Sequence, residues 1–411
     1  MRNRHPELLI PASSLEVLKT AVMFGADAVY IGGEAFGLRA KAKNFSMEDM
    51  KEGVRFAHDH GARVHVTVNI LAHNDDLEGA AEYLKELKEI GPDALIIADP
   101  AIFMLAKEIC PEIERHVSTQ ANNTNYGTYL FWNRMGAKRV VSARELSLAE
   151  IKEIRSHIPD DMEIESFIHG AMCISYSGRC LLSNFFTGRD ANQGACTHPC
   201  RWKYSIVEET RPGEYMPVYE NERGTYIFNS KDLCMIEHVP ELIDAGIDSF
   251  KIEGRMKTAL YVATVARTYR KAIDDYLKDP KLYEANMEWY KEEIGKCTYR
   301  EFTTGFYFGK PGSDAQIYNS NTYVKNYTYL GTVEEADGKG RCRIEQKNKF
   351  SVGETIEIMK PDGRNLEVVV KSICDEDGNE QESAPHPKQI LWVDLGADVD
   401  KYDILRKKED N

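Results

Sequence analysis

The sequence lacks any apolar stretch of the roughly 18–20 residues that a membrane-spanning helix requires. Its opening, MRNRHPELLIPASS, has two arginines but only a four-residue apolar run, which is too short for the core of a signal peptide. We therefore expect a cytoplasmic protein with no membrane partner.

Positive charge is also scarce, because 52 Lys and Arg residues face 66 Asp and Glu residues and give a formal net charge of −14. Such a chain is not coated in basic surface for nucleic acid, although a local basic patch on an acidic body is compatible with this balance.

Three well-known motifs are missing. The sequence has no HExxH zinc-protease motif and no GxSxG nucleophile elbow. The glycine-rich YIGGEAFG (30–37) does not fit GxGxxG, so we interpret it as a loop rather than a dinucleotide-binding turn.

One pattern recurs through the first three quarters of the chain: a helix-like segment, a glycine, and then a continuous apolar run. Glycine just past a helix is a common C-cap, and continuous apolar runs are typical of parallel strands covered on both faces. About nine strands, including TYIFNS (225–230), predict an α/β fold, a (β/α)8 TIM-like barrel over residues 1–310 rather than a doubly wound open sheet. The runs begin at Gly25, Gly61, Gly91, Gly136 and Gly246.

The pattern changes after about residue 320. The sequence there alternates apolar and polar residues, turns at Gly and Asp-Gly, and shows no helical period. About six short strands predict a small antiparallel β-barrel domain over residues 320–411.

Cysteine is rare, with nine in 411 residues, yet four fall within 28 positions of an inserted loop (170–204). The loop follows a predicted strand directly, and barrels place their active sites at the carboxyl ends of strands. Four thiolates suit a 4Fe–4S cluster or a tetrahedral zinc ion, while unrelated free thiols are a third interpretation. Cys234 is a fifth candidate ligand. The spacing C-x6-C-x15-C-x3-C is formed by Cys173, Cys180, Cys196 and Cys200.

Three segments resemble the collagenase-like peptidase family U-32: ESFIHGAMCISYSGRCLLS (165–183), NQGACTHPCRW (192–202) and KIEGRMKT (251–258). The resemblance spans the chain, and the two-domain length is similar to that of the tRNA-hydroxylating members. It implies an oxygen-independent hydroxylation of the wobble uridine of certain tRNAs to 5-hydroxyuridine, with prephenate as co-substrate. It also implies a 4Fe–4S cluster held by the four clustered cysteines.

Polar residues stand at the ends of several predicted strands, where they would converge on the barrel mouth. Glu253, Arg255, His169 and Glu165 are the residues that we expect to be catalytic. Other polar residues in such positions can simply satisfy hydrogen bonds within the barrel. These are His65, Asn69, His116, Gln120, Asn122 and Asn123.

The two carboxylates of prephenate call for guanidinium partners, because a planar guanidinium binds a carboxylate through two hydrogen bonds. Arg39, Arg179 and Arg255 are the candidates for this binding.

Two basic segments are candidates for contacting tRNA. Arg267, Arg270 and Lys271 share one helical face, which is either a solvated face or a stripe that contacts the RNA backbone. The cysteine loop is itself basic, and its aromatic residues could stack an unpaired base or belong to the core. Its basic residues are Arg179, Arg189, Arg201 and Lys203, and its aromatic candidates are Phe186, Trp202 and Tyr204.

Two other functions stay open at this point. A peptidase would need a nucleophile with a paired base, for which Cys173 and His169 are available. An RNA-binding protein stapled by structural zinc would carry zinc and need no small molecule. The sequence does not decide whether a related partner subunit takes part.

Overall fold

The computed structural model describes residues 5–37, 44–173, 175–202, 205–207, 215–217, 229–311, 315–317 and 323–409. Arg39, Lys203 and Tyr204 lie outside the described residues. The chain forms two compact units. The first comprises Met1–Leu15, Ala28–Arg255 and Arg300–Thr322, and the second comprises Glu16–Asp27, Met256–Tyr299 and Tyr323–Asn411.

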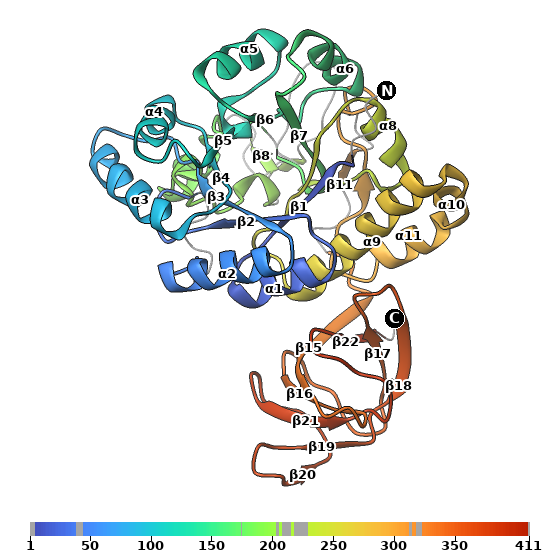
Figure 1. Cartoon of the computed structure of the whole chain (residues 1–411). Helices are drawn as coiled ribbons and strands as arrows, with labels where there is room; N and C mark the ends of the chain where they lie inside the picture. The colour runs from blue at the N-terminus through green and yellow to red at the C-terminus, as the bar shows by residue number, and fades with distance from the viewer. Residues whose placement is uncertain are drawn as a thin grey trace. The chain divides into compact units, whose positions relative to one another are not determined.

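The first unit is built on a closed barrel of eight parallel strands, which confirms the predicted fold class (Figure 1). The barrel closes because its last strand pairs in parallel with both the first and the seventh strand. The strands are β1 (Glu7–Pro11), β2 (Ala28–Gly32), β3 (Arg63–Val68), β4 (Ala94–Ile97), β5 (Glu114–Val117), β6 (Arg139–Val141), β7 (Glu163–Ala171) and β12 (Ser249–Ile252).

Helices alternate with these strands, and their ends follow from local sequence. Ser46, Asp99 and Ser147 cap helix N-termini by accepting hydrogen bonds from backbone N–H groups of the first turn. Gly91 and Gly136 end helices in the left-handed conformation that glycine adopts without strain. The helices of this unit are α2 (Met47–Asp59), α3 (Asp76–Ile90), α4 (Pro100–Ile109), α5 (Tyr126–Met135), α6 (Leu148–His157), α7 (Leu182–Thr187) and α8 (Val239–Asp244).

The expected strand TYIFNS does not join the barrel as far as it is described. Its last two residues form β10 (Asn229–Ser230), which pairs antiparallel with β14 (Gln316–Ile317). The following strand, β11 (Asp232–Cys234), runs antiparallel to the end of β7. The nine-residue β7 therefore extends past the barrel and carries a short ladder beside the cysteine segment.

The C-terminal residues form an antiparallel sheet of eight strands in the order β18-β17-β22-β15-β16-β21-β19-β20. Irregular register along β15 lets the sheet curl around its own apolar core. The antiparallel C-terminal domain is thus confirmed, with more strands than the six expected. They are β15 (Tyr327–Ala336), β16 (Arg341–Glu345), β17 (Thr355–Met359), β18 (Asn365–Val369), β19 (Ser372–Cys374), β20 (Glu380–Gln381), β21 (Ile390–Asp394) and β22 (Ile404–Lys408).

A buried ionic network joins helices and sheet within the second unit. Arg267 of α9 (Ala259–Lys278) and Arg406 of β22 both contact the Glu293 carboxylate, at 2.5 and 2.7 Å. Glu293 lies on α11 (Met287–Ile294). Arg267 is buried, so it cannot belong to a surface stripe that contacts RNA. The two residues predicted to share its helical face form ion pairs with carboxylates: Arg270 with Asp27 and Asp274, and Lys271 with Asp275.

The remaining helices of the second unit are α1 (Leu15–Met23) and α10 (Pro280–Ala285). Across the described residues, no helix has the length and apolar character needed to span a membrane.

Candidate functional site

Arg255 follows the last barrel strand and is buried against the ends of the second and third strands. Its Nη1 donates to the Thr67 hydroxyl at 2.9 Å, while that hydroxyl donates to the Ile31 carbonyl. A Cβ atom built on Gly32 would lie 2.7 Å from the same Nη1. The lack of a Cβ at Gly32 therefore leaves the space that the Arg255 guanidinium occupies.

Glu253 forms an ion pair that sequence analysis missed. Arg144 Nη2 lies 3.0 Å from Glu253 Oε2, and the Arg144 guanidinium lies 3.9 Å from the centre of the Phe167 ring. Gly170, with a φ of +104°, admits the Glu253 carbonyl, which would be 2.4 Å from a Cβ at that position. The only sequence signal for Arg144 is its place just after the sixth strand, a position shared by several residues.

The two β7 residues that we expected to be catalytic lie at different depths. His169 is near the end of the strand, opposite Cys234 in the ladder, and its ring is 5.6 Å from that of Phe302. Glu165 lies in the barrel interior, fully buried, within 2.6 Å of Lys251 Nζ and 3.1 Å of Arg139 Nη1. Burial alone would raise the pKa of Glu165, but Lys251 and Arg139 outweigh it and lower the pKa, so the carboxylate is ionised.

The cysteine segment docks on the carboxyl end of the barrel. Asn122, just past the fifth strand, donates to the Ser177 carbonyl at 2.8 Å, and Gln193 donates to the Leu71 carbonyl beyond the third strand. Within the segment, the Thr197 N–H donates to the Ser183 hydroxyl at 3.0 Å. These bonds place the segment where barrels build active sites, as its position after β7 predicted.

The cysteines of this segment form no disulfide among the described residues and are exposed or partly exposed, which makes them accessible as ligands. Soft thiolates are the donors that iron–sulfur clusters and zinc prefer, so the residue type suits either group. In the part of the chain that the structure describes, however, these thiols are not gathered into a group of three or more neighbouring ligand atoms. Cys234 is also partly exposed and outside any disulfide among the described residues, and it remains a candidate beside the other four. The thiols are those of Cys173, Cys180, Cys196 and Cys200.

The same segment exposes large apolar side chains. Phe185 is 80% exposed, and the Phe186 and Trp202 rings lie 6.3 Å apart, centre to centre. Arg179 and Arg189 are exposed on the same segment, and Arg179 stands at a turn closed by its N–H to the Tyr176 carbonyl. The described aromatic residues are therefore surface residues rather than core, and they belong to the same segment as these two arginines. The exposed apolar set comprises Tyr176, Leu181, Phe185, Phe186 and Trp202.

A closed parallel barrel with a cysteine-bearing segment at its carboxyl end, followed by an antiparallel β domain, defines the class: a TIM-type barrel protein with an appended β domain. The sequence matches Peptidase family U32 over residues 13–317 and the Peptidase family U32 C-terminal domain over residues 325–406. The chain belongs to peptidase family U32, which confirms the resemblance noted in its sequence.

Relatives match over nearly the whole chain. The chain is 43% identical to tRNA hydroxylation protein P1 of Bacillus subtilis (strain 168), over 98% of this chain and 95% of that protein. It is 39% identical to tRNA hydroxylation protein P of Escherichia coli (strain K12), over 98% and 96%. It is 41% identical to a 23S rRNA 5-hydroxycytidine synthase of the same strain, over 77% of this chain and 47% of that protein.

Proposed function

We propose that this chain is an RNA-modifying enzyme that hydroxylates tRNA. Its specific reaction would convert the wobble uridine to 5-hydroxyuridine without oxygen, using prephenate as co-substrate and a 4Fe–4S cluster. Full-length similarity to two tRNA hydroxylation proteins supports the RNA substrate and the hydroxylation. The observation that carries the proposal is the cysteine segment, which joins thiols, positive charge and exposed aromatic rings at the barrel's carboxyl end.

The exposed aromatic side chains are suited to bind a base that is not stacked on its neighbours in the RNA. A wobble base lies in a single-stranded loop, and proteins bind such bases by stacking them on aromatic rings. Arg179 and Arg189 supply positive charge for the neighbouring phosphates in an otherwise acidic chain. The local patch thus accounts for RNA binding despite the net charge of −14.

Arg255 and Arg179 are the described candidates for binding the carboxylates of prephenate. Arg255 is positioned by Thr67 and by the space at Gly32, so its planar donors are held in one orientation. Glu253 pairs with Arg144, so we assign Glu253 the role of fixing Arg144 at the mouth. A cluster on the cysteine thiols would supply electron transfer there.

The peptidase alternative finds little support in the structure. A cysteine nucleophile requires a base within hydrogen-bond reach. Among the residues that the structure describes, no histidine or carboxylate hydrogen-bonds the Cys173 thiol, and His169 instead packs against Phe302. The exposed aromatic patch favours RNA over a hydrolytic role for this segment.

Anaerobic reconstitution tests the proposal. The purified chain is analysed for iron, acid-labile sulfide and zinc, and then incubated with unmodified tRNA with and without prephenate. About four irons and four sulfides per chain, with prephenate-dependent 5-hydroxyuridine, are expected, and both should be lost in Cys173→Ala. One zinc ion per chain without sulfide would indicate a structural zinc site in place of the cluster and would overturn the proposed cofactor.

A further inference from the structure

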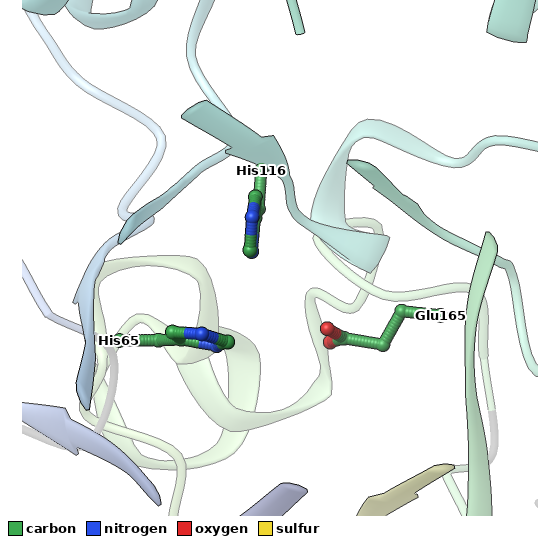
Figure 2. A group of neighbouring side chains, drawn as sticks. All are labelled: His65, His116 and Glu165. Atoms are coloured by element: carbon green, nitrogen blue, oxygen red, sulfur yellow. The ribbon is translucent and has the colours of Figure 1, made fainter. Parts of the chain in front are cut away.

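Three buried side chains meet inside the barrel, away from the cysteine segment. His65 of β3, His116 of β5 and Glu165 of β7 come from alternate strands, as the side chains of one barrel layer do. Figure 2 shows the two imidazoles and the carboxylate pointing toward a common space. Their ligand atoms all lie within 4.8 Å of one another, and none of the three residues is exposed to solvent.

The imidazole nitrogens at this place are short of partners. In the described part of the chain, neither ring nitrogen of His65 has a hydrogen-bond partner, and neither does His116 Nδ1. The two rings meet edge to face with centres 4.8 Å apart, so they do not bond each other. A buried polar atom without a hydrogen-bond partner destabilises the fold, so a ligand bound between these nitrogens would be stabilising.

The protonation of the three groups suits a cation. Burial lowers the pKa of His65 to about 3 and lowers the pKa of His116 well below its usual value. Both rings are therefore neutral at pH 7, and neutral imidazole is the form that binds metals. Glu165 is ionised, and its two oxygens can accept more bonds than the two from Lys251 and Arg139.

The net charge of the neighbouring ionised groups is negative, which favours a cation over an anion at this place. The linked groups inside and below this layer are Glu7, Glu114, Glu163, Glu165 and Asp93 against Arg63, Arg139, Lys251 and Lys138. Among the described residues that these ion pairs link, five carboxylates meet four lysine or arginine side chains, which leaves one negative charge. A divalent cation would turn this single negative charge into a single positive one, whereas an added anion would increase the negative excess.

We propose that His65, His116 and Glu165 form a site for one divalent transition-metal ion, zinc or ferrous iron. Two imidazoles and one carboxylate are a common donor set for these ions, and three protein ligands leave further positions for water. Thr67 and Phe167 follow His65 and Glu165 by two positions on the same strands, and Ser118 follows His116 by two positions, directly after β5. The site therefore lies one layer below the barrel mouth, about 7 Å deeper along each strand.

The site is independent of the proposed function and of the cysteine cluster. Its complete burial means that the ion enters while the chain folds and exchanges slowly afterwards. The metal content must therefore be measured on protein as purified from cells supplied with zinc and iron, rather than by titration of finished protein.

The test compares wild type with His65→Leu, because the His65 side chain makes no hydrogen bond to the described residues, and with the matched control His60→Leu at an exposed site. Metal is quantified by mass spectrometry and the cysteine cluster by acid-labile sulfide. The proposal predicts one zinc or iron fewer per chain in His65→Leu alone, with sulfide unchanged. Equal metal in all three proteins would overturn it.

If His65→Leu fails to fold, anomalous diffraction from the wild-type protein tests whether a metal ion is bound at this site. Anomalous maps from wild-type crystals at the zinc and iron edges should show a peak between His65, His116 and Glu165. An ordered water without anomalous signal would satisfy the same nitrogens and would contradict the metal site. Loss of sulfide or of tRNA hydroxylation in Cys173→Ala would test the proposed function without bearing on this result.

Discussion

At the scale of single residues, the site depends on side chains held in place by neighbours that carry no chemistry. Gly32 is the clearest case, since its missing Cβ leaves the space for the Arg255 guanidinium. Gly32→Ala should shift that guanidinium and lower tRNA hydroxylation on the order of 10- to 100-fold, because small displacements at a site are costly. Melting temperature and activity measured together check this.

A matched control for this prediction is Gly295→Ala. Gly295 has a φ of −81°, and a Cβ there would meet its nearest neighbour at an ordinary 3.5 Å. The Gly295→Ala variant should keep full tRNA hydroxylation activity. Equal activity in both variants would mean that the position of Arg255 does not matter for the reaction.

The sequence singles out Arg255 as a candidate but does not indicate its partners. The sequence places Arg255 after a strand, yet only the closed barrel brings Thr67 and Gly32, distant along the chain, against it. The same holds for Arg144 and Glu253. Glu165 was expected at the mouth, and strand periodicity could not tell that it lies one layer below.

At the scale of elements, the cysteine segment should bind RNA through its exposed rings. Trp202→Ala should weaken tRNA binding by about 1–3 kcal/mol, the usual contribution of one stacked base. Stability should barely change, because Trp202 is 46% exposed. The measurement is the tRNA dissociation constant at fixed salt. Phe131→Ala, at an equally exposed ring on α5, is the control, and equal affinity of both variants would refute stacking on Trp202.

The ionic network of the second unit should set its stability. Glu293→Gln leaves Arg267 and Arg406 buried without their shared carboxylate, which should cost about 3–5 kcal/mol in urea unfolding. The neighbouring Glu292→Gln should cost less than about 1 kcal/mol, because Glu292 is exposed. Similar losses in the two variants would contradict a structural role for the buried pair.

The same network predicts a pH dependence. Burial alone would raise the pKa of Glu293, but Arg406 and Arg267 outweigh it and lower the pKa to about 2. A carboxyl with a lowered pKa stabilises the fold above its unfolded value, and that contribution is lost as pH falls toward the folded value. The difference in unfolding free energy between wild type and Glu293→Gln should therefore be full at pH 6 and shrink below about pH 4. A difference that stays constant to pH 3 would be inconsistent with this.

The strands themselves could be predicted well because their signals are local. A glycine after a helix and a continuous apolar run marked β2, β3, β4, β6 and β12. TYIFNS carried the same apolar signal, yet its described end, Asn229–Ser230, pairs outside the barrel. Pairing partners are set by tertiary packing, which no local pattern encodes.

At the scale of the whole molecule, an acidic chain is expected to bind RNA through a small basic area. Replacing Arg179 and Arg189 together by glutamine should lower the slope of log affinity against log salt by about two, roughly one for each phosphate that is no longer neutralised. Arg364→Gln, at an exposed arginine of the C-terminal sheet, should leave the slope unchanged. Salt titrations of tRNA binding measure the slope. An unchanged slope in the double variant would mean that the RNA phosphates contact other residues.

We propose that this chain hydroxylates tRNA through its cysteine segment. The most direct measurement is mass spectrometry of tRNA nucleosides from a bacterial host deprived of its own tRNA hydroxylation proteins and supplied with this chain or with Cys173→Ala. We expect 5-hydroxyuridine and its derivatives with the wild-type chain and none with Cys173→Ala. A host that stays without 5-hydroxyuridine while the wild-type chain accumulates in folded form would contradict it.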